Sequence, residues 1–141
     1  MGVVYLVKDP QLGRLLALKL VRQKSASPAA RERFWREAAA MAQIQHPGVI
    51  KVHKVDRVEA GQYLLEEYVE GENLDEVLER GPPPFDQTTQ IMRDLADAVE
   101  AVHRHGILHR DIKPANVILR ADTGRPMLLD FGLAREVDAE T

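Results

Sequence analysis

The chain has 141 residues, a formal net charge of −3 and no cysteine. The missing cysteines exclude a disulfide framework and a thiolate metal site, and the slightly acidic balance gives no support to a nucleic-acid partner. Apolar residues make up 45% and charged residues 29%, the balance of a soluble globular protein. Because no stretch approaches the roughly 18 apolar residues that span a bilayer, we expect no membrane segment. The lack of cysteine fits a reducing cytoplasm, where we expect the protein to be located.

Charge is distributed unevenly along the chain. Residues 1–54 hold ten Lys/Arg and three Asp/Glu, whereas residues 55–141 hold nine and nineteen. This asymmetry is compatible with a basic part that faces phosphates and an acidic part that faces a metal or a basic peptide, and equally with ordinary solvated surface.

The first half of the chain predicts four strands and one helix. Two β-rich runs, 3–7 and 15–21, flank a turn and predict a hairpin. A helix is expected from Pro28 to residue 45, where His-Pro-Gly ends it. Two further strands are expected at 49–58 and 62–68, with Gly71 breaking the second.

The second half is mostly helical. Helices are expected at 74–80 and 88–105, the longer one carrying an apolar stripe, followed by a hairpin of two short apolar runs at 117–119 and 127–129. Strands with one helix followed mainly by helices indicate an α+β fold with a boundary near 69–71.

Three oxygen-bearing side chains stand out. Asp111 and Asn116 lie five apart in a polar loop after the long helix, and Asp130 follows fourteen residues later at the end of an apolar run. Two carboxylates and an amide suit a hard cation such as Mg²⁺, and Lys113 adds a positive charge to the same loop. Taken singly, each residue is more often a cap or turn former.

Together these residues match a known signature set. The order of motifs resembles the eukaryotic-type (Hanks-type) serine/threonine protein kinases, and the wording is most similar to bacterial members. The matching segments are Ala17-Leu18-Lys19, Glu37, His46-Pro47, Glu67-Tyr68-Val69-Glu70-Gly71, His109-Arg110-Asp111-Ile112-Lys113-Pro114-Ala115-Asn116 and Asp130-Phe131-Gly132. The fold that this implies is the two-lobed kinase fold, incomplete in this chain.

The resemblance implies a catalytic role for three residues. Asp111 would orient the substrate hydroxyl and accept its proton, while Lys113 would neutralise charge on the transferring phosphoryl group. Asn116 and Asp130 would hold Mg²⁺. Lys113 followed by Pro114 resembles the enzymes that act on serine or threonine in a protein substrate.

The resemblance also implies an ATP site. Lys19 would contact the α- and β-phosphates and form an ion pair with Glu37. The backbone of Glu67 and Val69 would bind the adenine edge, between apolar side chains. The full implied ATP-binding set is Gly2, Val4, Ala17, Lys19, Glu37, Glu67, Val69, Ile118 and Asp130.

The chain departs from the family pattern at both ends and at one internal position. Only the last glycine of the glycine-rich loop, Gly2, is present, and nine residues follow Gly132. We therefore expect a partial N-lobe at 1–70 without its first strand, and a partial C-lobe at 71–141 without the rest of the activation segment and the later helices. We also expect the isolated chain to be marginally stable or to expose a large apolar patch. Glu66 directly precedes the segment 67–71, which resembles the hinge between the two lobes. This is the family's gatekeeper position, where an apolar residue is usual, and a carboxylate buried there needs a partner or a raised pKa.

Two other functions remain open from the sequence. One is a non-catalytic, pseudokinase-like or regulatory piece that binds nucleotide or a partner. The other is a small-molecule phosphotransferase of the aminoglycoside or choline type, whose members share a His-x-Asp-x-x-x-x-Asn loop but lack Lys113-Pro114.

Overall fold

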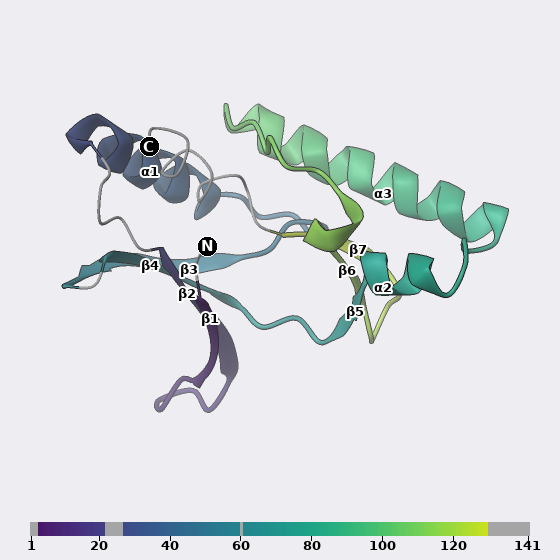
Figure 1. Cartoon of the computed structure of the whole chain (residues 1–141), viewed down its shortest axis with the longest axis horizontal. Helices are drawn as coiled ribbons and strands as arrows, with labels where there is room; N and C mark the ends of the chain where they lie inside the picture. Colours follow the sequence, from purple (N-terminus) through teal and green to yellow (C-terminus); the bar gives the residue numbers. More distant parts are fainter. Residues whose placement is uncertain (1–2, 22–26, 60, 130–141) are drawn as a thin grey trace. The chain divides into compact units, whose positions relative to one another are not determined.

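The structure is a computed structural model that describes residues 3–21, 27–59 and 61–129 (Figure 1). The chain divides into two compact units. Of the described residues, unit 1 holds those up to Gln43 together with Lys51–Tyr68, and unit 2 holds Ile44–Ile50 together with those from Val69 to Leu129. Each unit is described by itself. The predicted lobe ranges, 1–70 and 71–141, stay a prediction.

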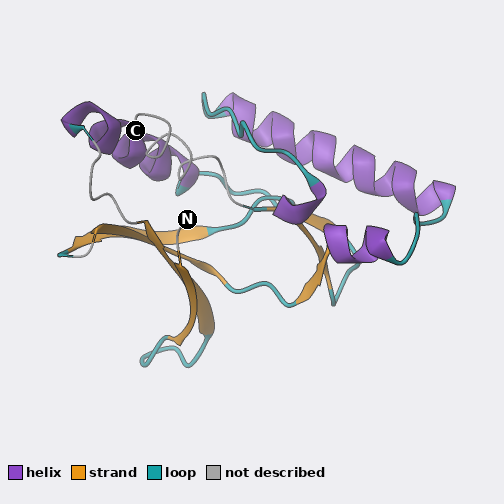
Figure 2. Ribbon diagram, in the orientation of Figure 1, coloured by secondary structure: helices purple, strands orange, loops and turns teal. Residues whose placement is uncertain are grey.

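Unit 1 is a four-stranded antiparallel sheet with one helix. The strands, orange in Figure 2, are β1 (Val3–Lys8), β2 (Leu15–Val21), β3 (Val52–Val58) and β4 (Gly61–Glu67). They lie in the order β1-β2-β4-β3. The predicted hairpin is confirmed, because β1 pairs with β2. The Asp9 carboxylate stabilises its turn by accepting from the backbone N–H groups of Gln11 and Leu12.

Helix α1 (Pro28–Met41) begins where the sequence predicts. The Ser27 hydroxyl accepts from the Ala30 N–H at 3.1 Å, and Pro28 occupies the first turn, where its missing N–H costs nothing. The helix ends at Met41, four residues before the predicted end. Its buried residues, spaced for one helical face, are Ala30, Phe34, Ala38 and Met41.

The strand predicted at 49–58 begins only at Val52, so the prediction is wrong for its first residues. The segment before it pairs elsewhere: Val49 forms a parallel bridge with Leu128, and the Ile50 N–H donates to the Leu128 carbonyl at 3.1 Å. An apolar run shows that a segment is buried, but it does not show which strand it pairs with.

Unit 2 packs two helices on a three-stranded antiparallel sheet. Its helices are α2 (Leu74–Glu79) and α3 (Phe85–Arg104), and its strands β5 (Gly71–Asn73), β6 (Val117–Arg120) and β7 (Pro126–Leu128) lie in that order. The core joins one face of α3 to the sheet and consists of Ile91, Leu95, Val117, Leu119 and Leu128. The predicted hairpin at 117–129 and both predicted helices are confirmed.

Two boundaries in unit 2 differ from the prediction. Gly71 does not break a strand as expected but begins the short strand β5, which pairs with β6. Helix α3 begins at Phe85 rather than residue 88, because the Pro84 carbonyl already accepts the first intrahelical bond, from the Thr88 N–H at 2.9 Å. Among the described residues, no helix combines the length and apolar character that a bilayer crossing requires.

Candidate functional site

The predicted catalytic loop, residues 109–116, follows α3 in unit 2 and is held at both ends. At its start, the His109 ring is 2% exposed. Its Nδ1 accepts from the Asp111 N–H at 3.1 Å, so its Nε2 must carry the hydrogen that reaches the Leu129 carbonyl at 2.6 Å. His109 is therefore a neutral imidazole that connects the loop to the end of β7.

Arg110 has a φ of 64°, and it is the one non-glycine residue with positive φ in the part of the chain that the structure describes. A left-handed conformation costs a side-chain-bearing residue about 1–2 kcal/mol, so the surrounding hydrogen bonds must hold it. This left-handed residue directly precedes Asp111.

The three predicted catalytic residues come together in this loop. The Asn116 Nδ2 donates to the backbone carbonyl of Asp111 at 2.8 Å and to its Oδ2 at 3.0 Å. The Lys113 ammonium lies 3.5 Å from the same Oδ2. A carboxylate with an amide donor and a cation beside it is kept ionised and oriented, which a group that accepts a hydroxyl proton requires.

Asn116 is the most buried of the three, at 7% exposed. It ends the 3-10 turn Pro114–Asn116, and its carbonyl accepts from the Leu129 N–H at 2.8 Å. Because both Nδ2 contacts point at Asp111, the amide Oδ1 is the oxygen left for a cation. This donor type fits the predicted Mg²⁺ ligand.

Asn73 was not singled out from the sequence, although it supports the loop. Its Nδ2 donates to the Ala115 carbonyl at 2.8 Å while its Oδ1 accepts from the Asp75 N–H at 2.9 Å. One side chain thus caps α2 and anchors the 3-10 turn. The sequence signal was an asparagine directly before a helical run, a common N-cap.

Two predicted ATP-site residues lie in unit 2. In β6 the side chains of Val117 and Leu119 are buried in the core, so Ile118 points to the other face of the sheet, where it is half-buried. Val69 follows β4 and is also half-buried. An apolar side chain on the sheet face away from the core suits contact with a flat ring.

Three more predicted residues share one face of the unit 1 sheet. Val4 pairs with Lys19 across β1 and β2, and Ala17 precedes Lys19 by two residues. Directly opposed residues, and residues two apart, point to the same side of a sheet. The register therefore presents two small apolar groups and one ammonium group on a single surface.

Glu37 lies on α1, three residues after Phe34 and four before Met41, both of which are buried. These spacings place Glu37 on the same side of the helix as the buried stripe, and it is itself half-buried. Lys19 and Glu37 both belong to unit 1.

Glu67 and Glu66 end β4 with side chains on opposite faces. The Glu67 Oε1 accepts from the Lys51 N–H at 2.9 Å, and the Glu67 N–H donates to the Lys51 carbonyl at 2.9 Å. This leaves the Glu67 carbonyl as the backbone group that could meet adenine. Glu66 is buried, as the sequence argument assumed, at 8% exposed.

Two predicted site residues, Gly2 and Asp130, lie outside the described residues. The neighbour of Asp130 is well anchored, since Leu129 is hydrogen-bonded to both His109 and Asn116. Within the described ranges no group of three or more His, Cys, Asp or Glu is placed to hold a metal ion.

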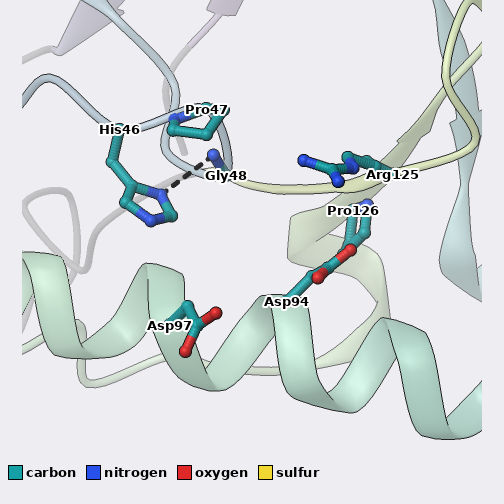
Figure 3. A pocket seen from close by; sticks show the side chains of 7 residues that line it. All are labelled: His46, Pro47, Gly48, Asp94, Asp97, Arg125 and Pro126. Carbon is teal, nitrogen blue, oxygen red and sulfur yellow. Dashed lines mark hydrogen bonds between the residues drawn. The ribbon is translucent and has the colours of Figure 1, made fainter.

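Unit 2 also has a cavity of about 90 Å³ that none of the predicted site residues lines. Figure 3 shows Asp94 and Asp97 from α3 on one side, with His46, Pro47, Gly48, Arg125 and Pro126 on the others. The one hydrogen bond among the residues drawn joins the Gly48 N–H to the His46 Nδ1, at 3.0 Å. The Asp94 Oδ2 is buried without a partner among the described residues.

Comparison with known proteins gives a consistent result. The family model described as "Protein kinase domain" matches residues 1–141. Serine/threonine-protein kinase pkn2 of Myxococcus xanthus is 40% identical over 147 residues, which cover 99% of this chain and 17% of that protein. PknB of Mycobacterium leprae is 35% identical over 147 residues, covering 100% of this chain and 24% of that protein.

Solved structures agree. The kinase domain of Mycobacterium tuberculosis PknI matches with a TM-score of 0.80 at 32% identity, covering 100% of this chain and 60% of that chain. Rad53 1-466 in complex with AMP-PNP matches with a TM-score of 0.82 at 25% identity, covering 94% of this chain and 35% of that one. The chain spans about a fifth of the length of the two curated relatives.

Proposed function

Because the chain belongs to the protein kinase domain family, we propose that the protein transfers the γ-phosphoryl group of ATP to serine or threonine hydroxyls of other proteins. The α+β fold expected from the sequence, with a helix-bearing antiparallel sheet, is the one that its structural neighbours share. The resemblance to mostly bacterial serine/threonine kinases is confirmed.

The observation that carries this proposal is the geometry around Asp111. A phosphoryl transfer needs positioning and charge neutralisation more than covalent help. The Asp111 carboxylate is fixed by Asn116 and lies 3.5 Å from the Lys113 ammonium. These groups would orient an incoming hydroxyl and offset the negative charge that develops on the phosphoryl oxygens.

The proposed transfer forms one phosphorus–oxygen bond and breaks another. The substrate hydroxyl oxygen forms a bond to the γ-phosphorus while its proton passes to Asp111, and the bond from the γ-phosphorus to the bridging β-phosphate oxygen breaks. Phosphoprotein and ADP are the products. Lys113 stabilises the transferring group but does not itself gain or lose a proton.

The family implies ATP as the substrate and a divalent metal as its companion. We assign Lys19, with Glu37, to the ATP phosphates, and Val4, Ala17, Ile118 and the backbone of Glu67 and Val69 to the adenine. Asn116, with Asp130, would hold Mg²⁺, which neutralises phosphate charge when bound. Gly2 completes the proposed set. The absence of cysteine fits the reducing cytoplasm, where we place the reaction.

The test is phosphoryl transfer from γ-labelled ATP to a generic basic protein, comparing the chain with Asp111→Asn. We expect the substitution to lower the transfer rate by about 10²–10⁴-fold, the usual worth of a positioned general base. Asp122→Asn is the matched control, because Asp122 is an exposed carboxylate of unit 2. Equal incorporation by the chain and by Asp111→Asn would contradict catalysis by this chain.

A further inference from the structure

Glu66 is the one acidic side chain that is buried among the described residues. It lies on β4, an inner strand of the sheet, and is 8% exposed. Removing a carboxylate from water costs several kcal/mol unless a cation or hydrogen-bond donors replace the water, so a buried glutamate requires a partner or a proton. The proposed reaction does not use Glu66.

The strand register identifies its neighbours. Glu66 pairs with Ala17 on β2 and with Val52 on β3, so the residues directly opposite are both apolar. The next positions on the same face are the diagonal neighbours on β2 and β3, which lie about 7–8 Å from Glu66, within reach of long side chains.

Lys19 is the cation at such a diagonal position. It pairs with Leu64, two residues before Glu66 on the same strand, and therefore points to the same face of the sheet. The other diagonal position on β2 is Leu15. The diagonal position on β3 is Val55, which pairs with Leu64, so both remaining diagonal neighbours are apolar. Among the described residues, Lys19 is thus the one lysine that the register places next to Glu66 on this face of the sheet.

We propose that Glu66 is a second carboxylate partner of the Lys19 ammonium group, sharing it with Glu37, and that it weakens the hold of Lys19 on nucleotide phosphates. The ion pair is inferred from register and burial alone. The effect on phosphates rests on the proposed function, in which Lys19 contacts ATP.

The physical consequence is a competition. A phosphate group that approaches Lys19 must share the ammonium with a carboxylate that cannot move to solvent, because Glu66 is buried. The added negative charge also repels the phosphates across a partly desolvated site, where charges a few ångströms apart interact more strongly than in water. Adenosine carries no phosphate, so its binding should not depend on this charge.

The ion pair is tested by a double-mutant cycle of Lys19→Met and Glu66→Gln, with urea unfolding as the readout. We expect the two substitutions together to shift the unfolding midpoint by clearly less than the sum of the single shifts. The matched control is Lys19→Met with Glu67→Gln, because Glu67 is the adjacent glutamate on the opposite face, and there the shifts should add. Additive shifts with Glu66→Gln would overturn the pair.

A second measurement needs no substituted protein, so it does not depend on whether a variant folds. The carboxyl carbon of Glu66 is titrated by NMR in the unmodified chain. A pKa below the ordinary glutamate range supports a cationic partner, whereas a pKa raised by burial overturns it.

The effect on nucleotide is tested by comparing ADP and adenosine affinities of the chain with those of Glu66→Gln. We expect ADP to bind on the order of tenfold more tightly to the variant, with adenosine affinity unchanged. Equal gains for both ligands would show a change in adenine fit and overturn the competition. If neither protein binds either ligand, the proposed function and the competition both fail, whereas coupling in the unfolding cycle would still support the ion pair.

Discussion

At the scale of single residues, the polar side chains of the 109–116 loop are held by hydrogen bonds, most of them to backbone groups. His109 uses both ring nitrogens, one on the Asp111 N–H and one on the Leu129 carbonyl, so it can neither carry a second proton nor rotate without losing a bond. Asn116 holds the Asp111 carboxylate and carbonyl with a single amide nitrogen. A loop whose polar groups are satisfied in this way is pre-organised, which electrostatic catalysis requires.

A pH titration at Asp122 is a residue-scale prediction. The Arg120 Nε and Nη2 each lie 3.0 Å from an Asp122 carboxylate oxygen, and this pairing lowers the pKa of Asp122 to about 2. Because the folded pKa lies below the ordinary 3.8, the contribution of the pair to stability is complete above pH 3.8 and is lost as the pH falls through about 2.

The measurement is an NMR titration of the Asp122 carboxyl carbon. Arg120→Gln should return its pKa toward 3.8, because the glutamine carries no charge. A pKa that stays near 2 in this variant would show that the turn backbone, rather than the guanidinium, lowers it.

At the scale of elements, the small sheet of unit 2 depends on a close backbone approach at Gly71. A Cβ built on Gly71 would lie 2.2 Å from the Leu119 carbonyl oxygen and 2.7 Å from the Ile118 Cγ2. Neither atom belongs to the end of a flexible side chain. Strand β5 can therefore pair with β6 at this point only without a side chain.

Gly71→Ala should accordingly destabilise the chain by about 3 kcal/mol, at the upper end of the usual cost of overpacking. Chemical denaturation measures the loss, and faster hydrogen exchange in β5 and β6 would localise it. Gly124→Ala is the control, since its Cβ meets nothing within 4 Å and its cost comes from a φ of 67° alone, about 1 kcal/mol. Equal losses in both variants would contradict the close-approach explanation.

Helix α3 shows two contrasting faces. Leu95 is 8% exposed and belongs to the core of unit 2, whereas Phe85 is 84% and Met92 61% exposed. That such exposed side chains form a large apolar patch stays a prediction.

At the scale of the whole molecule, the division into two units predicts a local response to core damage. Leu95→Ala removes side-chain volume from the unit 2 core and should cost about 2–5 kcal/mol. Because unit 1 has its own sheet and helix, we expect hydrogen exchange to accelerate most in β6, β7 and α3, and less in β2 and β4. Phe85→Ser, at a surface site on the same helix, should change neither the free energy of unfolding nor the exchange rates of either unit. A uniform acceleration across both sheets would show that the units unfold as one.

Much of the fold could be predicted because local signals and tertiary structure agree. Pro28 after a serine set the start of α1, and the period of the apolar residues set the buried face of α3. The errors fall where pairing is a long-range choice. Residues 49 and 50 were expected to belong to the strand that ends at Val58, yet they pair with Leu128, far along the chain.

The sequence by itself determined the family and predicted three catalytic residues in one short loop, whose members stay close together in the chain. Asp111, Lys113 and Asn116 lie within six residues, and the structure brings them into contact. Only the tertiary structure decided the role of Asn73 at Ala115, the need for glycine at position 71 and the position of Glu66 diagonal to Lys19. These features depend on strand register and on contacts between segments far apart in the chain, which no local pattern encodes.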